Sequence, residues 1–198
     1  MMNEIDRFHD TNLQDIDLLG RLDQYFDTLQ EQLRLGNGWF IFSAGGKRGS
    51  RIISFVLSRV ADYRMMASYY FVPWRDFSLT SYMVGVELKS LSPDRADRET
   101  QQISAAEYQI ASRVSQDAMV KMVASDLLII TGLRPAYRHE VSFLDETIAR
   151  RYDQHLATIL LSPYRQDELA AEFDKVVPGT STWENLFRRM YERSLIAA

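Results

Sequence analysis

The sequence predicts an α/β domain in which a mostly parallel sheet is covered by helices on both faces. Four apolar runs of strand length alternate along the chain with amphipathic helical patterns, as in βαβ units. Each run is continuously apolar, which is typical of strands buried on both faces of a parallel sheet. With 198 residues, 46% of them hydrophobic and 25% charged, the chain fits one globular domain over residues 1–198.

The first 35 residues are predicted to form a helical lead-in to a core over residues 36–198. Apolar residues recur at three- and four-residue spacing from Leu18 to Leu33, and Gly36 ends that helix. In chain order the core is then predicted to contain strand 39–42, a helix from about 50 to 63, strand 68–72, a short helix from 74, a mobile loop over 88–102, a helix over 103–124, strand 126–130, a helix from about 140 to 155, strand 157–162, a helix over 165–173 and a helix over 183–194.

The turn between the first strand and its helix is rich in glycine and in positive charge. Its residues are Ala44, Gly45, Gly46, Lys47, Arg48, Gly49, Ser50 and Arg51. A buried strand, a glycine-rich turn and a helix form the architecture in which backbone N–H groups bind phosphate. The motif for this chemistry is G-x-x-x-x-G-K-S/T. Aligned to it, Ala44 and Gly49 take the two glycine positions, while Ser50 replaces the lysine and Arg51 the magnesium-binding hydroxyl.

Composition excludes several classes of chemistry. The chain has no cysteine, which excludes disulfides and thiolate catalysis and fits a reducing cytoplasm. No apolar run approaches the ~20 residues of a membrane span, and the first residues do not resemble a signal peptide. We therefore expect a cytoplasmic protein with no membrane partner. His9, His139 and His155 are too dispersed to predict a metal site, and no nucleophile motif of the hydrolase type is present.

Two later stretches resemble a known family. Residues 126–133 read Asp-Leu-Leu-Ile-Ile-Thr-Gly-Leu, and residues 143–152 read Phe-Leu-Asp-Glu-Thr-Ile-Ala-Arg-Arg-Tyr. The second is followed by Ala-Thr-Ile-Leu-Leu-Ser at 157–162 and Asp-Glu-Leu at 167–169. With the preceding strand, turn and helix, this pattern resembles the AAA+ ATPase core of the DnaC/IstB group, which contains bacterial helicase loaders and transposition accessory ATPases. The resemblance covers about residues 36–194 and implies a three-layer αβα fold of the P-loop NTPase type.

The resemblance also implies where the catalytic residues should lie, and the expected residue types are missing. The acidic pair that holds magnesium-bound water and activates the attacking water falls on Thr131 and Gly132. The polar sensor after the fourth strand falls on Pro163, and the arginine expected near the start of the last helix falls on about Asn185. Phosphoryl transfer depends on these charges. The resemblance therefore implies a pseudo-ATPase with no catalytic residue, no metal and no required cofactor.

The resemblance suggests a protein that acts by binding in bacterial or phage DNA replication. AAA+ subunits assemble side by side, and a subunit with an inactive site can still contact its neighbour. The first hypothesis is therefore docking on an active AAA+ protein or on the replicative helicase, in a homo- or hetero-oligomer. Its candidate contacts are Arg188, Arg189 and Arg193.

Two alternatives remain open from the sequence. One is an ATP-binding helicase loader or transposition accessory ATPase with an unorthodox phosphate loop, in which Lys47 and Arg48 contact phosphate. The other is a DNA-binding replication accessory protein that uses Lys47, Arg48 and Arg51 on backbone phosphates. The net charge of −4 argues against a protein coated with nucleic acid over its whole surface.

Overall fold

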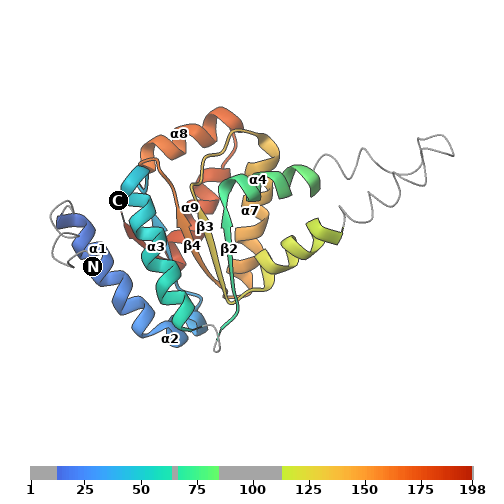
Figure 1. The fold of residues 1–198 in the computed structure, drawn as a ribbon. Helices are drawn as coiled ribbons and strands as arrows, with labels where there is room; N and C mark the ends of the chain where they lie inside the picture. The colour runs from blue at the N-terminus through green and yellow to red at the C-terminus, as the bar shows by residue number, and fades with distance from the viewer. Residues whose placement is uncertain (1–12, 64–66, 85–112, 198) are drawn as a thin grey trace.

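The computed structural model describes residues 13–63, 67–84 and 113–197, and it forms a parallel sheet between two layers of helices (Figure 1). In chain order its elements are α1 (Leu13–Asp27), α2 (Leu29–Leu35), β1 (Gly38–Ile41), α3 (Gly46–Asp62), β2 (Tyr69–Pro73), α4 (Trp74–Tyr82), β3 (Leu127–Thr131), α7 (Arg138–Asp153), β4 (Ala157–Leu161), α8 (Gln166–Val176), α9 (Thr182–Arg193) and β5 (Ser194–Ala197). Residues 113–124 form a further helical segment before β3. The predicted three-layer α/β class is confirmed.

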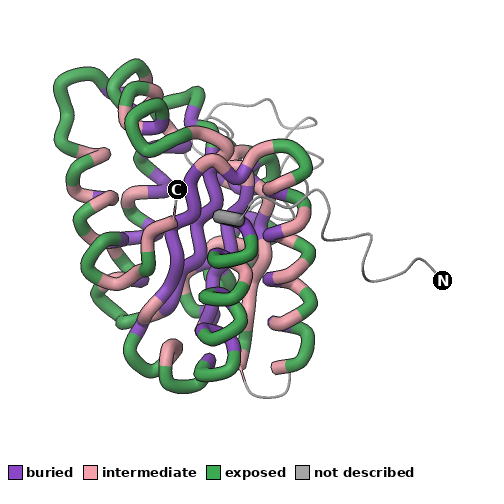
Figure 2. The backbone as a smooth tube through the Cα atoms, turned by 90° about the vertical axis from the view of Figure 1, so that its left-hand side faces the viewer, coloured by how far each residue is buried: buried purple, intermediate pink, exposed green. Residues whose placement is uncertain are grey.

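The five strands lie in the order β2-β3-β4-β1-β5, and every neighbouring pair is parallel. Every residue of β1, β3 and β4 is buried, because helices cover both faces of these strands. Figure 2 shows this buried backbone running through the sheet, with exposed residues on the outer sides of the helices. The continuous apolar runs in the sequence are explained by this double coverage.

Successive residues of a strand contribute to two separate cores. Trp39 and Ile41 pack with residues of α1, α2 and α3 on one face of the sheet. Phe40 and Phe42 pack with residues of α4, α7, α8 and α9 on the other face. The alternation follows from the period of two along a strand. It fixes the register of β1, since a shift by one residue would exchange the two sets of aromatic and aliphatic side chains.

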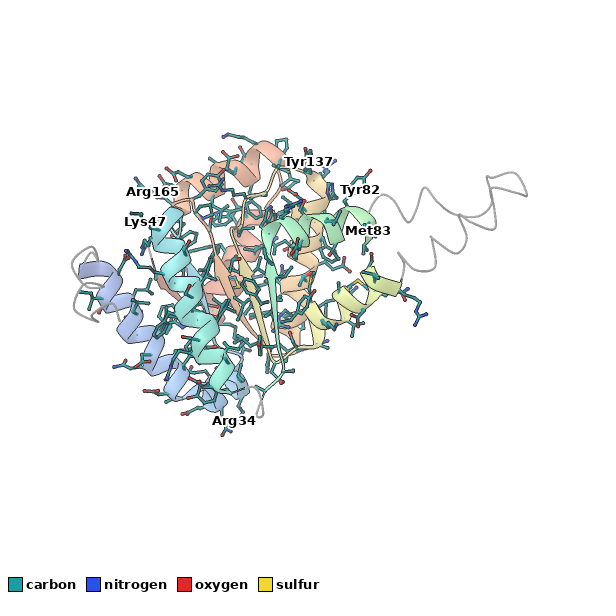
Figure 3. The ribbon with its side chains drawn as sticks, in the orientation of Figure 1. Arg34, Lys47, Tyr82, Met83, Tyr137 and Arg165 are labelled. Atoms are coloured by element: carbon teal, nitrogen blue, oxygen red, sulfur yellow. The ribbon has the colours of Figure 1, made fainter. Side chains whose placement is uncertain are left out.

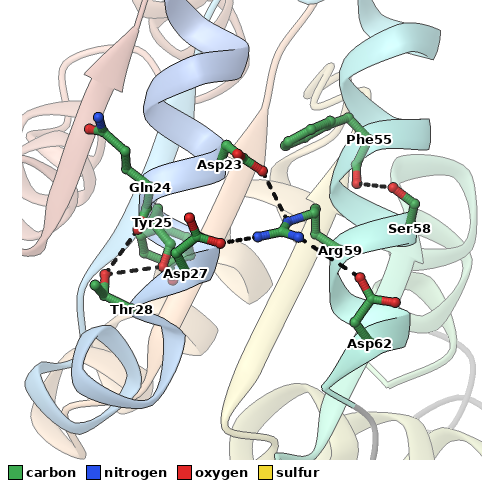
Figure 4. Close-up of polar contacts among 9 residues, drawn as sticks. All are labelled: Asp23, Gln24, Tyr25, Asp27, Thr28, Phe55, Ser58, Arg59 and Asp62. Carbon is green, nitrogen blue, oxygen red and sulfur yellow. Dashed lines mark hydrogen bonds and ion pairs between the residues drawn. The ribbon is translucent and has the colours of Figure 1, made fainter.

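Helix α1 is held against α3 by ion pairs as well as by apolar packing. The guanidinium of Arg59 on α3 pairs with the carboxylates of Asp23 and Asp27 on α1, and a third carboxylate, that of Asp62, lies 4.0 Å away (Figure 4). Leu18, a buried residue of α1, belongs to the same core as α3. The helical lead-in is therefore an integral layer of the domain.

Three predicted helix boundaries were wrong, and one strand was missed. The first helix is two helices, because the backbone at Thr28 leaves helical geometry while the apolar face continues. Helix α3 begins at Gly46, four residues earlier than predicted. Helix α8 extends to Val176, three residues further than predicted. A fifth strand, β5, follows α9 without any turn residue and pairs with β1 from Gly38 to Ile41.

Part of the prediction falls outside the described residues. This applies to the first 12 residues of the lead-in, to the predicted loop over 88–102 and to residues 103–112 of the predicted helix that follows it.

Candidate functional site

The strand order places a candidate ligand site at the carboxyl ends of β1 and β4. The connection that leaves β1 leads to β2, at one end of the strand order. The connection that leaves the neighbouring strand β4 leads to β5, at the other end. In open α/β sheets, ligands bind at such a topological switch point. The residues that border it are the β1–α3 connection, residues 42–45, and the residues that follow β4, 162–165. This is also the place of the glycine-rich turn.

The turn does not form the open loop that the sequence alignment requires. Helix α3 begins at Gly46, so Lys47, Arg48 and Gly49 lie in its first turn, and only residues 42–45 separate it from β1. Gly46 adopts φ +54° and turns the chain into the helix. A Cβ on Gly49 would lie 2.2 Å from the carbonyl oxygen of Ala44. Gly49 is therefore required by the close approach of the helix to its own connection.

The two segments at the switch point are joined to each other by backbone hydrogen bonds. The Ser43 amide donates to the Tyr164 carbonyl (2.9 Å), and the Ala44 amide donates to the Ser162 carbonyl (2.8 Å). The buried Ser162 hydroxyl donates to the Leu133 carbonyl (3.1 Å), which links the residues after β4 to those after β3. Both amides are therefore used inside the protein and fix the β1–α3 connection against the residues that follow β4.

Two of the three cations of the turn bind a carboxylate of the chain itself. Asp15, a buried residue of α1, accepts hydrogen bonds from Arg48 Nε and from Arg51 Nη2, both at 2.6 Å. Arg48 also donates to the Phe42 carbonyl (2.9 Å). Burial alone would raise the pKa of Asp15, but the hydrogen bonds and charges of Arg48 and Arg51 outweigh it and hold the pKa below 3.8. These two arginines connect α1, α3 and the end of β1.

Lys47 is the cation of the turn that faces outward. Its side chain is exposed, and within the described residues no ion pair is found for it. Figure 3 shows Lys47, Arg165, Tyr137 and Tyr82 along the edge where the strands have their carboxyl ends, and Arg34 at the opposite edge. Of the three predicted anion contacts, Lys47 therefore has the geometry of a surface residue, whereas Arg48 and Arg51 have structural partners.

The predicted positions of the acidic pair and the sensor lie at the same edge of the sheet, where β3 and β4 have their carboxyl ends. Thr131 is the last residue of β3 and is buried. Gly132 adopts φ +73°, a conformation that an acidic side chain seldom adopts. The Cβ of Pro163 lies 3.5 Å from the position of a Cβ on Gly45, so the segments after β1 and β4 are in contact. The backbone at these positions is specialised for a tight turn and close packing.

The three arginines of α9 differ in their surroundings. Arg189 pairs with Asp145 of α7 at 2.6 Å. Arg193 donates to the Leu35 carbonyl (3.1 Å) and lies over the ring of Tyr152. Arg188 is exposed, and its one ion pair among the described residues is a 3.5 Å contact with Glu192, one turn further along α9. Arg188 is therefore the member of this predicted set that is best placed to contact another protein.

Arg151, from the second stretch of the resemblance, is a structural residue. Its side chain is 1% exposed, and its guanidinium donates to the carbonyls of Met122 (2.8 Å) and Ser125 (2.9 Å) and to the Thr158 hydroxyl (2.9 Å). A further bond reaches the Ala157 carbonyl. Burial lowers the pKa of Arg151 to about 10, and the charge of Asp126 partly opposes this shift. Arg151 joins α7 to the end of the preceding helical segment and to β4.

A second hollow at the same edge of the sheet was not predicted from the sequence. It has a volume of about 690 Å³ and lies between the segment after β3 and helix α8. We call it the loop groove; its polar and aromatic lining consists of Arg134, Tyr137, Arg138, Tyr164, Glu172 and Lys175. The sequence signal was present as the run Arg-Pro-Ala-Tyr-Arg-His over 134–139, which combines cations with aromatic rings directly after a buried strand.

The sheet order, the two helical layers and the glycine turn at the switch point define the class of protein by fold: a three-layer αβα domain of the P-loop NTPase type. No protein-family model matches the sequence, and no curated protein matches it either. Within the described residues, no helix is both long and apolar enough to cross a membrane. The same residues bring no group of three metal-ligating side chains together.

Solved structures of DNA replication proteins have a similar fold. The chain is similar to the crystal structure of the DnaC helicase loader, with a TM-score of 0.62 and 15% identity, over 96% of this chain and 93% of that one. A DNA replication initiation factor is similar with a TM-score of 0.57 and 13% identity, over 96% and 48%. The replication initiator DnaA, solved with AMPPCP and single-stranded DNA, gives 0.53 and 13%, over 89% and 45%. The chain thus spans about half the length of the last two.

Proposed function

We propose that this chain is an AAA+-fold protein of DNA replication that acts by binding another protein and does not hydrolyse ATP. Its partner is an active AAA+ subunit or the replicative helicase. The replication setting is proposed from the fold similarity to a helicase loader and to two initiation proteins.

The observation that carries the proposal is the closed switch point. Helix α3 starts at Gly46, and the amides of Ser43 and Ala44 donate to the residues that follow β4. A phosphate enclosed by the aligned loop over residues 44–51 would require the first turn of α3 to unwind, and two of the three cations there are already paired with Asp15. Each buried backbone group left without a partner costs about 1–3 kcal/mol. The binding energy of a phosphate group would first have to offset that cost.

The residue types at the catalytic positions support the same proposal. Ser50 and Arg51 stand where phosphate transfer uses a lysine and a magnesium-binding hydroxyl, and Thr131 and Gly132 stand where it uses two acids. Thr131 and Gly132 provide no carboxylate to hold magnesium-bound water or to activate the attacking water.

Nucleotide titration tests the first half of the proposal. The purified chain is titrated with labelled ATP and magnesium, and phosphate release is followed in the same samples. We expect neither saturable micromolar binding nor phosphate release. Micromolar binding that Lys47→Ala abolishes, while the exposed control Lys121→Ala retains it, would establish the unorthodox ATP site instead. Binding to DNA that falls steeply with salt and depends on Lys47 would favour the DNA-binding alternative.

Co-elution tests the second half. The chain is mixed with the purified replicative helicase of its source, or with a DnaC-type AAA+ protein from it, and applied to a sizing column. We expect a complex with one of them, weakened by Arg188→Glu. The matched control is Arg150→Glu, because both arginines are exposed and pair with a glutamate four residues away. Elution of the chain alone from both mixtures would refute the proposed function.

A further inference from the structure

The loop groove carries an excess of positive charge. Arg134, Arg138 and Lys175 contribute three cations, and Glu172 contributes one carboxylate, which pairs with Lys175. No carboxylate partner of Arg134 or Arg138 is found among the described residues. Two guanidinium groups at the wall of one hollow are thus available for bidentate bonds to a carboxylate from outside.

One of these cations is already held in position. The Arg134 guanidinium lies over the ring of Tyr164, 5.6 Å from its centre. A cation–π contact of this kind restricts the side chain before a ligand arrives. The loss of side-chain freedom on binding is reduced accordingly. The groove is therefore partly organised for an anionic group.

The segment after β3 adds the aromatic ring of Tyr137 to the lining. Tyr137 is 62% exposed and stacks on His139, with ring centres 5.5 Å apart and an angle of 14° between the ring planes. His139 in turn meets the edge of Tyr82 at 5.6 Å. Tyr137 and Tyr82 both lie at the carboxyl edge of the sheet in Figure 3. Exposed tyrosine next to arginine is the composition of energetic hot spots in protein interfaces.

The surroundings favour a short acidic peptide over a nucleic-acid strand. Helix α8, which forms one wall, contributes the Glu172 carboxylate to the lining, so a long polyphosphate strand would meet a like charge within the groove. The amides at the start of α7 are not available to phosphate, because Ala136 and Tyr137 donate them to the Glu140 carboxylate at 2.7 and 3.0 Å.

We infer that the loop groove binds a short acidic segment of a protein partner, with carboxylates on Arg134 and Arg138 and an apolar or aromatic side chain against Tyr137. The inference deepens the proposed function, since it assigns the protein-binding role to one surface and one kind of ligand. The volume of the loop groove, about 690 Å³, lies within the range of volumes found for ligand pockets.

Fluorescence polarisation with defined probes tests the inference on the full chain. The probe is a short labelled peptide that alternates glutamate with leucine and phenylalanine. The same peptide with lysine in place of glutamate and a thymidine oligonucleotide of equal length serve as comparisons. We expect saturable binding of the acidic peptide alone. The double variant R134E/R138E should weaken it by about tenfold or more, and higher salt should weaken it further.

Two matched variants separate the groove from general charge and from folding. Arg34→Glu changes an exposed arginine at the opposite edge and should leave peptide binding unchanged. Tyr137→Phe should retain binding and Tyr137→Ala should lose much of it, with unchanged circular dichroism in both. The inference is overturned if the lysine peptide or the oligonucleotide binds as tightly as the acidic peptide, or if R134E/R138E binds like the parent chain. A helicase complex that forms without the groove would overturn the inference and leave the proposed function intact.

Discussion

Replacing Arg151 by alanine should destabilise the domain strongly, although this residue touches no candidate site. Its guanidinium is buried and serves the carbonyls of Met122, Ser125 and Ala157 together with the Thr158 hydroxyl. Arginine near the end of a helix is a favourable partner for the last carbonyls. Here one side chain performs that role for the helical segment 113–124 and at the same time contacts β4.

The size of the stability loss follows from the carbonyl groups that lose their hydrogen-bond donor. In Arg151→Ala, three buried carbonyls lose a charged donor, and each unsatisfied group costs about 1–3 kcal/mol when water cannot replace the donor. Removal of the cation also removes its own desolvation cost, and some water will enter the space. We therefore expect a loss of about 3–5 kcal/mol, the range for breaking a buried charged network. Arg151→Lys should recover part of this loss, because one ammonium group cannot reach acceptors on both sides.

Urea unfolding followed by tryptophan fluorescence and circular dichroism measures the effect. The midpoint should fall while the slope with urea concentration stays constant. Arg150→Ala is the matched control, because Arg150 lies on the exposed side of the same helix and its pair with Glu146 should contribute less than about 0.5 kcal/mol. This account of the buried arginine would be refuted if the free energies of unfolding of Arg151→Ala and Arg150→Ala agreed within about 1 kcal/mol.

Two further predictions concern the glycine-rich turn, one for Asp15, which pairs with its arginines, and one for Gly49. Because the folded-state pKa of Asp15 is lowered below 3.8, its contribution to stability should be present above about pH 4 and disappear as the pH falls through the folded-state value. In urea unfolding, Asp15→Asn should therefore lose about 2 kcal/mol at pH 7, and this loss should shrink as the pH falls through the folded-state pKa of Asp15; a loss that stays constant as the pH is lowered would contradict the assignment. Gly49→Ala should lose about 1–3 kcal/mol, because its Cβ would overlap the Ala44 carbonyl. Gly20→Ala, where a Cβ meets no atom within 4 Å, should gain about 0.5–1 kcal/mol by thermal unfolding; similar effects for the two glycines would contradict the close-approach argument.

The strands could be predicted from the sequence because they are buried on both faces. Continuous apolar runs identified β1, β3 and β4 to within one residue. The strand β5 could not be found in this way, because its four residues follow α9 without a break and have only one neighbouring strand, β1. Its existence depends on the edge of the sheet offering a partner, which is a property of the tertiary fold.

The candidate site was harder to predict, because charge pairing is not visible in the sequence. The run containing Lys47, Arg48 and Arg51 predicted an anion site, and the glycines around it predicted a tight turn. The turn is present, but Asp15, which lies 33 residues before Arg48, supplies the anion from within the chain. No local pattern links these positions, since they meet only when α1 packs on α3. The loop groove escaped notice for the same reason, because Arg134 and Lys175 come together only through the contact of two loops with α8.

The hydrogen bonds that join the turns after β1, β3 and β4 have a consequence for the time scale of motion at this edge. The amides of Ser43, Ala44 and Leu133 donate to carbonyls in or directly after the neighbouring strand β4. They should therefore exchange their hydrogens with solvent as slowly as amides inside the sheet, through opening of the whole unit. An edge of this kind cannot open and close quickly on its own. If the proposed function holds, this edge offers the partner one fixed surface, and any switching of the complex has to come from the partner.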